Sequence, residues 1–287
     1  MKRIALFRFH HQFERNRHLL KFLKYLNPEM EIYGLYGGPP EKFSEAGYML
    51  DEVLTHNFLI EDRDSTWKWK HSDMAFQLWY RDYGHQVDFD MMHSVEWDLL
   101  YFESLDKLFG HADQNTLALT GLVPLNRIEK RWYWTRHETE RPEWLKLHDY
   151  FKTNFNYNKA PFGMIGPGTS LPRNFLEKIK DVEIPYLSND ELRIPMLAQV
   201  FGFKMEDTKF YRKWFSDREL KYFNSNAIGI DIRTIEKQLK KKNGRRAFHP
   251  CNMSLTYEQL VGLHNLIREN TSSRTRNTSF LSLLKNA

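Results

Sequence analysis

Residues 93–109, HSVEWDLLYFESLDKLF, predict the element around which the rest of the chain can be arranged. Apolar residues surround Glu96 and Asp98 in its first half, which favours a strand that ends in two acids and leads into a short helix. Side chains two positions apart in a strand point to the same face, so these carboxylates should project together. Such a pair suits Mg²⁺ or Mn²⁺, which often take only one or two carboxylates from a protein.

The preceding segment predicts an α/β fold. Residues 2–9 and 31–36 have the apolar content of strands, and the segment between them has apolar residues on one helix face: Leu19, Phe22, Leu23 and Leu26. A strand, a helix and a strand in this order form a βαβ unit with two parallel strands. A Gly-Gly-Pro-Pro turn at residues 37–40 follows, at the carboxyl edge where open α/β sheets bind ligands.

Two further elements agree with this class. We expect a helix that Ser72 caps and Gly84 ends, with an aromatic face that packs into the core and consists of Phe76, Trp79, Tyr80 and Tyr83. A short apolar strand is expected over residues 116–124.

Composition limits the class of protein. The 287 residues include eight Trp and 21 Phe, which favours a packed globular protein over a disordered chain. The single cysteine, Cys251, excludes an internal disulfide and is typical of a reducing compartment. No apolar run has the length of a membrane span, and the first residues do not form a signal peptide. We therefore expect a soluble, cytoplasmic protein of one large domain with a C-terminal extension.

Much of the net charge of +5 comes from one segment, residues 237–246. Its cations are Lys237, Lys240, Lys241, Lys242, Arg245 and Arg246. Their positive field could attract phosphates, nucleic acid or an anionic membrane face, and a solvated helix face with a turn explains them equally well.

Two middle stretches contain residue types that are common in binding sites. The aromatic and charged residues 131–144 could stack on a sugar, form a lid or pack against the edge of the domain. Residues 161–170 are rich in small residues, which let a ligand approach the backbone closely. This run lacks the lysine of a P-loop and the spacing of a dinucleotide fingerprint, so it is not a Rossmann cofactor loop.

Two capping boxes are predicted near the end of the chain. Ser188 and Glu191 precede a helix over residues 192–201, and Thr256 and Gln259 precede a last amphipathic helix. The tail at residues 270–277, rich in Ser, Thr and Arg, is predicted to be mobile.

The order of these features resembles that of glycosyltransferases with the GT-A fold. That family has Asp-x-Asp, an apolar stretch and a helix start similar to Pro-Leu-(Asp/Glu)-x-Leu-Phe; this chain has Glu96 for the first Asp and Ser104 for the Pro. A literal Asp-x-Asp, Asp88 and Asp90, lies at the start of the same strand, and we prefer the later pair. The resemblance implies one GT-A-like domain with a Rossmann-like mixed central sheet flanked by helices.

The resemblance also implies a donor site. Asp98 and His249, with Glu96, would bind Mn²⁺ or Mg²⁺ at the diphosphate of a UDP- or GDP-linked sugar. Arg8 and His10 lie at the end of the first strand, where the family binds the nucleotide.

The same resemblance implies where the sugar and the acceptor bind. Gly166 and Gly168 would border the donor sugar. Asp190 and Glu191 start the helix at which inverting members of the family place a general base, and Asp190 is preferred because capping already explains Glu191. If the reaction retains configuration, the role of Asp190 lapses.

These assignments divide the chain into parts. Residues 1–250 would form the catalytic domain, with a nucleotide-sugar half at 1–110 and an acceptor half at 111–250; residues 251–287 would form a C-terminal helix and mobile tail. The acceptor would be a hydroxyl of a glycan or another molecule. The chain allows weak peripheral membrane contact, and nucleic acid is not expected as a partner.

Two other classes use some of the same residues. A metal-dependent nuclease or nucleotidyltransferase also needs clustered acids, but nuclease cores of the Asp…Glu-x-Lys type place a lysine where this chain has Asp98. A non-catalytic nucleic-acid-binding protein would use residues 237–246, leave the acids solvated and bind in a salt-sensitive way.

Overall fold

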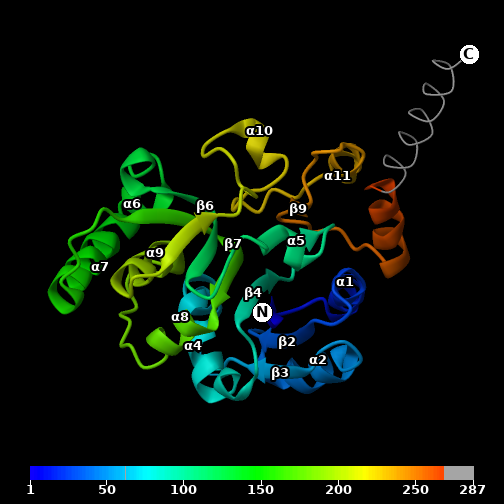
Figure 1. The fold of residues 1–287 in the computed structure, drawn as a ribbon, viewed down its shortest axis with the longest axis horizontal. Helices are drawn as coiled ribbons and strands as arrows, with labels where there is room; N and C mark the ends of the chain where they lie inside the picture. The colour runs from blue at the N-terminus through cyan, green and yellow to red at the C-terminus, as the bar shows by residue number, and fades with distance from the viewer. Residues whose placement is uncertain (62, 268–287) are drawn as a thin grey trace, which may run out of the picture.

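Seven strands form a mixed sheet in the middle of the protein, in the order β3-β2-β1-β4-β7-β6-β8 (Figure 1). The computed structural model describes residues 1–61 and 63–267. The strands of this sheet are β1 (Arg3–Phe9), β2 (Glu31–Tyr36), β3 (His56–Leu59), β4 (Met91–Glu96), β6 (Thr116–Pro124), β7 (Phe162–Pro172) and β8 (Lys204–Asp207). Two short strands pair separately, β5 (Leu100–Tyr101) and β9 (Ala247–Phe248).

Parallel pairing gives this sheet an edge at which several strands end together. β1 pairs in parallel with β2 and β4, and β2 with β3. β7 runs antiparallel between β4 and β6, whereas β8 is parallel to β6. The carboxyl ends of β1, β2 and β4 are therefore neighbours, and Arg8 lies directly opposite Glu96 in the register.

Helices cover both faces of the sheet. Along β1, Ile4 and Leu6 pack into one core cluster, and Ala5 and Phe7 pack into the cluster on the other face. Since successive side chains of a strand alternate between faces, a strand buried on both sides is apolar throughout. The helices are α1 (Phe13–Leu26), α2 (Phe43–Leu50), α3 (Ser65–Lys70), α4 (Ser72–Asp82), α5 (Leu105–Phe109), α6 (Tyr133–Arg136), α7 (Glu140–Phe155), α8 (Arg173–Ile179), α9 (Asp190–Val200), α10 (Asp217–Leu220) and α11 (Ile232–Leu239), with 3₁₀ turns η1 (Pro40–Lys42), η2 (Gly84–Gln86) and η3 (Leu125–Arg127).

The main sequence predictions about the fold are confirmed. The first βαβ unit, the strand over residues 116–124 and the α/β class with a mixed central sheet flanked by helices are all present. The aromatic face of α4 lies in the core, where Phe76, Trp79 and Tyr80 are buried. Among residues 1–61 and 63–267, the structure has no helix that is both long and apolar enough to span a bilayer.

Three local predictions are wrong. The strand predicted to end in both Glu96 and Asp98 is shorter: β4 ends at Glu96. Asp98 lies in the turn before β5, which is closed by a bond of 2.9 Å from Leu99 N to Glu96 O. Ser72 does not cap α4, since its hydroxyl donates to Asp190 instead. Ser188 does not cap α9 either: Asn189 is the N-cap residue, and Ser188 has a positive φ of 57°.

The second capping box and the last helix are as expected. Thr256 N donates to Gln259 Oε1 over 2.9 Å, and Gln259 N donates to Thr256 Oγ1 over 3.3 Å. The helix that follows, residues 257–267, buries Leu260 and Leu263 in a cluster that also contains residues of α1. The tail predicted to be mobile, residues 270–277, lies outside the described residues.

Candidate metal and donor site

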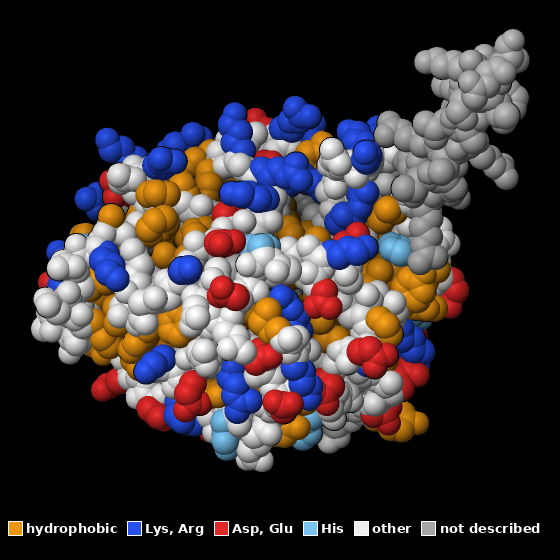
Figure 2. Space-filling model, viewed as in Figure 1, with side chains coloured by type: hydrophobic (Ala, Val, Ile, Leu, Met, Phe, Trp, Pro, Cys, Tyr) orange, Lys and Arg blue, Asp and Glu red, His pale blue; other side chains and the backbone are white. Residues whose placement is uncertain are grey.

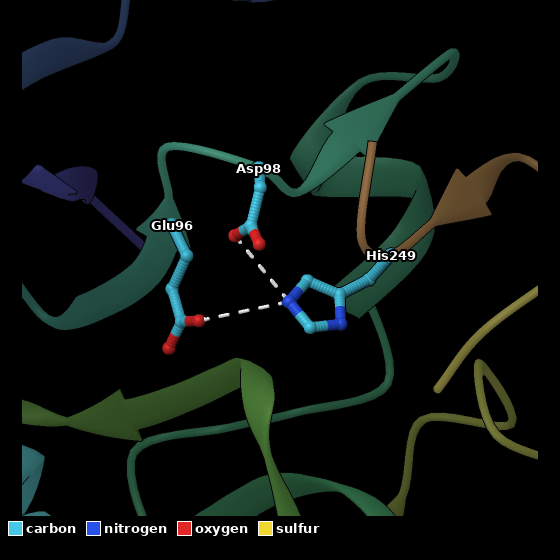
Figure 3. Close-up of side chains that lie close together, drawn as sticks. All are labelled: Glu96, Asp98 and His249. Carbon is cyan, nitrogen blue, oxygen red and sulfur yellow. Dashed lines mark ion pairs between the residues drawn. The ribbon is translucent and has the colours of Figure 1, made fainter. Parts of the chain in front are cut away.

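Glu96, Asp98 and His249 come together at the carboxyl edge of the sheet (Figure 3). His249 Nε2 is 3.3 Å from Asp98 Oδ1 and 3.9 Å from Glu96 Oε2. One ligand atom from each residue lies within 4.8 Å of the other two. The alternative pair is not part of this group: Asp88 and Asp90 bind Lys2 at the opposite end of β4.

The pairing of β5 with β9 explains how residues so far apart in sequence meet. Leu100 lies opposite Phe248, which places His249 beside the turn that contains Asp98. Cys251 N then donates to the carbonyl of Asp98 over 2.7 Å, which fixes the two segments together.

The His249 ring is oriented by a backbone contact. Its Nδ1 lies 2.6 Å from the carbonyl oxygen of Asn224. A carbonyl only accepts, so Nδ1 carries the proton and Nε2 faces the two carboxylates. Metal-binding histidines are commonly held in this way by a second hydrogen bond, which makes Nε2 the ligand atom.

Burial and the neighbouring charges shift the pKa values of all three groups. Burial opposes a charge on His249, but the hydrogen bond and charge of Asp98 outweigh it and raise the pKa of the ring. Burial raises the pKa of Glu96, and burial also opposes ionisation of Asp98, where His249 overcomes it and lowers the pKa. Two carboxylates and one imidazole are a donor set suited to Mn²⁺ and, with less preference for the nitrogen, Mg²⁺.

Arg8 and His10, at the end of β1, lie beside this group. Arg8 Nη1 donates to Glu96 Oε1 over 2.9 Å, and Nη2 donates to the carbonyl of Lys68 over 3.1 Å. The His10 ring packs 4.0 Å from that of His11 and 5.4 Å from that of Trp97. Burial, followed by the neighbouring His11, lowers the pKa of His10 to about 4, so His10 is uncharged at neutral pH.

A cleft of about 590 Å³ lies at the ends of β1 and β2, next to Trp97, whose ring contacts those of His10 and His11. His10, His11 and Arg15 line it, together with Tyr36 and Lys42. The negative charge of Asp98 acts on His10, His11 and Arg15, although Asp98 does not itself line the cleft.

Arg15 is a candidate that the sequence analysis missed. Its guanidinium carbon lies 4.9 Å from the centre of the Trp97 ring, and its Nε donates to the carbonyl of Met253 over 3.0 Å. A usable signal was present: Arg15 is in the first turn of the helix that follows β1, and this turn lies at the carboxyl edge of the sheet.

Asp190 and Glu191 form a second buried group. Asp190 accepts a hydrogen bond from Ser72, and burial, followed by the charge of Asp73, raises its pKa to about 6. The positive charge of Arg8 acts on both Asp190 and Glu96 and lowers the pKa of each, against the effect of burial.

Glu191 is held by three donors and is not a capping residue. Its Oε1 accepts from Gly166 N over 2.9 Å, and its Oε2 accepts from Trp134 Nε1 over 2.7 Å and Asn189 Nδ2 over 3.2 Å. These donors favour the carboxylate, but burial and the charge of Asp190 outweigh them and raise the pKa of Glu191 to about 8.

The free energy of unfolding should therefore decrease as pH rises, because Glu191 must lose its proton while buried. Its pKa in the folded protein, about 8, lies above its ordinary value of 4.5, so its contribution is fully present below pH 4.5 and is lost as pH rises through 8. The slope within this window is about 1.4 kcal/mol per pH unit. Urea denaturation at pH values between 6 and 8, above the raised pKa of Asp190, should show that Glu191→Gln removes this slope, while Glu138→Gln, on an exposed side chain, keeps it. An unchanged slope in Glu191→Gln would contradict the assignment.

Gly166 and Gly168, predicted to border the donor sugar, lie within strand β7. The space next to Gly166 faces the buried acids: a Cβ there would lie 3.8 Å from both Asp190 Oδ2 and Glu191 Oε1. Gly168 has a φ of +77°, which favours glycine, and a Cβ would lie 3.1–3.2 Å from Phe210, Thr120 and Tyr101. Gly166 therefore lies next to Asp190 and Glu191, whereas the positive φ at residue 168 explains why glycine occupies that position.

The aromatic stretch at residues 131–144 is mainly part of the core. Trp132, Trp134 and Trp144 are buried. Of the three roles that the sequence left open, sugar stacking, a lid and packing against the domain, their burial agrees with packing. Tyr133 differs, since it is 48% exposed.

No protein-family model matches the chain, and no curated protein sequence matches it. Among solved structures, it is similar to an active-site mutant of LgtC, with 13% identity, 72% of this chain and 74% of that chain covered, and a TM-score of 0.41. It is also similar to the galactosyltransferase LgtC in complex with donor and acceptor sugar analogs, with 12% identity, the same coverage and a TM-score of 0.39.

A third similar structure is the apo form of the glycosyltransferase GlyE from Streptococcus pneumoniae TIGR4. The identity is 16%, the match covers 73% of this chain and 46% of that chain, and the TM-score is 0.34. These neighbours are glycosyltransferases, the class that the sequence resemblance indicates. The TM-scores lie below 0.5, so the fold and the roles of individual residues rest on the geometry of this chain.

Proposed function

We propose that the protein is a metal-dependent glycosyltransferase that moves a sugar from a nucleotide-diphosphate sugar to a hydroxyl of a glycan or another acceptor. The observation that carries the proposal is the meeting of Asp98, Glu96 and His249 beside a cleft at the carboxyl edge of the sheet. Ligands of open α/β sheets bind at this edge. The buried, unpaired Cys251 is compatible with the cytoplasmic location that we include in the proposal.

The donor would bind across the cleft and the three metal-binding residues. Asp98 and His249 would hold Mn²⁺ or Mg²⁺, with Glu96 as a third ligand that Arg8 also binds. When bound, the cation supplies positive charge that stabilises the leaving diphosphate. Arg15 lines the cleft in which the donor would bind, and its charge would add to the positive field at the diphosphate.

The acceptor would react on the side of the site that contains Asp190, and residues 111–250 would form most of the acceptor half. In an inverting reaction, the acceptor oxygen forms a bond to the anomeric carbon while its proton passes to an Asp190 oxygen. The bond between the anomeric carbon and the diphosphate oxygen breaks, and the nucleoside diphosphate leaves with the electron pair. A retaining reaction would not use Asp190 as a base.

The dependence of the rate on pH tests the role of Asp190. A base must be deprotonated, so kcat should rise about tenfold per pH unit below pH 6 and level off above it. The hydrogen bond from Ser72 lowers the pKa of Asp190, and Ser72→Ala should therefore move this limb of the profile to higher pH. Asp190→Asn should lower kcat about 100-fold and leave donor binding unchanged. A profile that Ser72→Ala does not shift would remove Asp190 from the role of base.

A thermal-shift panel tests the proposal as a whole. UDP- and GDP-linked sugars are added with and without Mn²⁺, and a ligand that binds only the folded state raises Tm. We expect at least one sugar nucleotide to raise Tm only when Mn²⁺ is present. If no member of the panel does so, the proposed function is wrong.

A further inference from the structure

The segment over residues 209–246 carries a charge that the proposed function does not use. It contains twelve Lys and Arg against four Asp and Glu, a surplus of eight cations, whereas the whole chain has a net charge of +5. The rest of the chain is therefore net acidic. Ten of the twelve cations are exposed, and we call these the basic face: Lys209, Arg212, Lys213, Arg218, Lys221, Arg233, Lys237, Lys240, Lys241 and Lys242.

The exposed cations lie on one side of the molecule. Figure 2 shows Lys and Arg gathered along the upper part of the protein, where α10 and α11 lie in Figure 1, while Asp and Glu are more frequent in the lower part. The remaining two cations of the segment have structural roles. Arg245 pairs with the buried Glu219 over 2.7 Å, and Arg246 donates to the carbonyls of Gln238 and Lys241.

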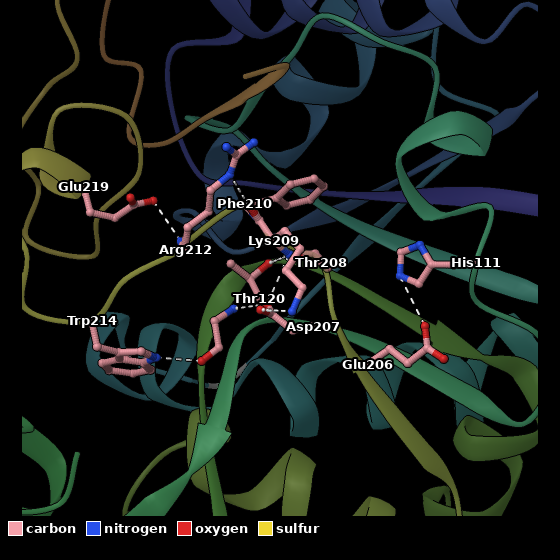
Figure 4. A network of polar contacts seen from close by, with 11 residues as sticks. His111, Thr120, Glu206, Asp207, Thr208, Lys209, Phe210, Arg212, Trp214 and Glu219 are labelled. Atoms are coloured by element: carbon pink, nitrogen blue, oxygen red, sulfur yellow. Dashed lines mark hydrogen bonds and ion pairs between the residues drawn. The ribbon is translucent and has the colours of Figure 1, made fainter. Parts of the chain in front are cut away.

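The basic face is held firmly to the sheet (Figure 4). Trp214 Nε1 donates to the carbonyl of Gly121 in β6 over 2.7 Å, and the hydroxyls of Thr120 and Thr208 lie 3.0 Å apart. Arg212 N donates to Glu219 Oε1 over 2.9 Å, so the same carboxylate that binds Arg245 also orders the loop before α10. These contacts tie residues 209–219 of the segment to the sheet, and α11 is held separately by Ile235 and Leu239, which are buried in a core cluster.

We propose that the basic face docks the protein on an anionic lipid bilayer. Several cations near an anionic membrane act together, and each adds about fivefold to partitioning at low salt. Within residues 209–246 the exposed large hydrophobic side chain is Ile228, 53% exposed, and no aromatic ring is exposed. An exposed aliphatic side chain on the same segment suits the boundary of headgroups and acyl chains. Single-stranded nucleic acid is usually bound with exposed aromatic rings as well, which favours the lipid surface.

Docking in this orientation would place the metal-binding residues next to the bilayer. The carbonyl of Asn224, which lies between α10 and α11, accepts the hydrogen bond from His249. The segment that carries the basic face thus also orients a metal-binding residue. In combination with the proposed function, this predicts an acceptor presented at a membrane surface; the docking itself requires neither metal nor donor.

Sedimentation with vesicles tests the docking. The full chain is mixed with vesicles of phosphatidylcholine alone or with 30% phosphatidylglycerol, at about 0.1 M and about 0.5 M salt. We expect binding to the anionic vesicles only, and loss of that binding at high salt. The variant Lys237→Glu/Lys241→Glu/Lys242→Glu should bind at least about 100-fold more weakly, because three cations are lost. The matched control Lys146→Glu/Lys152→Glu/Lys178→Glu changes the net charge equally at exposed positions outside the basic face and should bind as the unmodified protein does.

Three results would overturn the proposal. One is the absence of binding to anionic vesicles at low salt, and another is an equal loss in both triple variants, since that would show an effect of net charge alone. The third is tighter binding to duplex DNA than to vesicles, with the DNA displacing the lipid, which would assign the basic face to nucleic acid. Because the readout is lipid binding, a failure here leaves the thermal-shift test of the proposed function unaffected.

Discussion

Asp98→Asn should abolish the dependence of sugar-nucleotide binding on Mn²⁺ and lower the transfer rate about a thousandfold. A metal ion contributes several kcal/mol to the stabilisation of transition-state charge, and each 1.4 kcal/mol is a factor of ten in rate. Asn has the shape of Asp, and the backbone bond from Cys251 N to the carbonyl of residue 98 does not involve the side chain. The fold should therefore be retained while the charge is lost. Thermal shifts with and without Mn²⁺ and the initial transfer rate are the measurements.

The other acid-x-acid motif of the chain supplies the control. Asp88→Asn removes a carboxylate of the same type from the opposite end of β4, where the Asp88 side chain is 90% exposed. It should change neither the response to Mn²⁺ nor the rate. If Asp98→Asn keeps a metal-dependent rise in Tm, Asp98 is not a ligand; if Asp88→Asn loses it, the wrong pair has been chosen.

The sequence predicted the fold well where a pattern spans a whole element. The apolar residues of β1 and the helix face of α1 follow from periodicity alone, because burial on both sides of a parallel sheet leaves little freedom of residue type. Periodicity could not predict the break after Glu96. The turn at Asp98 depends on the pairing of β5 with β9, which lies about 150 residues away along the chain, and contacts of that range leave no local signal.

The site was predictable only in part, because local spacing does not show which residues meet in the folded protein. Asp98 and His249 were predicted together from the family resemblance, and the structure brings them to 3.3 Å. The second group shows the limit of local reading. Ser188 and Glu191 have the spacing of a capping box, yet Glu191 accepts hydrogen bonds from Gly166 and Trp134. Glu191 thus bonds to residues distant in sequence and not to the start of its own helix, and the spacing of the motif is the same in both cases.

Arg193→Met should lower the free energy of unfolding by about 3–5 kcal/mol, the usual cost of removing one partner from a buried ion pair. Arg193 is fully buried and forms two bonds of 2.7 Å to Asp73, from Nε to Oδ2 and from Nη2 to Oδ1. Its Nη1 also donates to the carbonyl of Leu187 over 2.8 Å, so one side chain connects α9, α4 and the segment before α9. The variant would leave the Asp73 carboxylate buried without its partner. Urea denaturation at neutral pH measures the loss.

The double variant Arg193→Met/Asp73→Asn separates lost packing from uncompensated charge. Asn is neutral and similar in shape, so the double variant should recover part of the stability that Arg193→Met loses. The ion pair should also affect the proposed base. The charge of Asp73 raises the pKa of Asp190 and that of Arg193 lowers it, so Arg193→Met should move the pH limb of kcat upward and the double variant should return it. A loss of less than about 1 kcal/mol, with no movement of the limb, would show that this ion pair supports neither the fold nor Asp190.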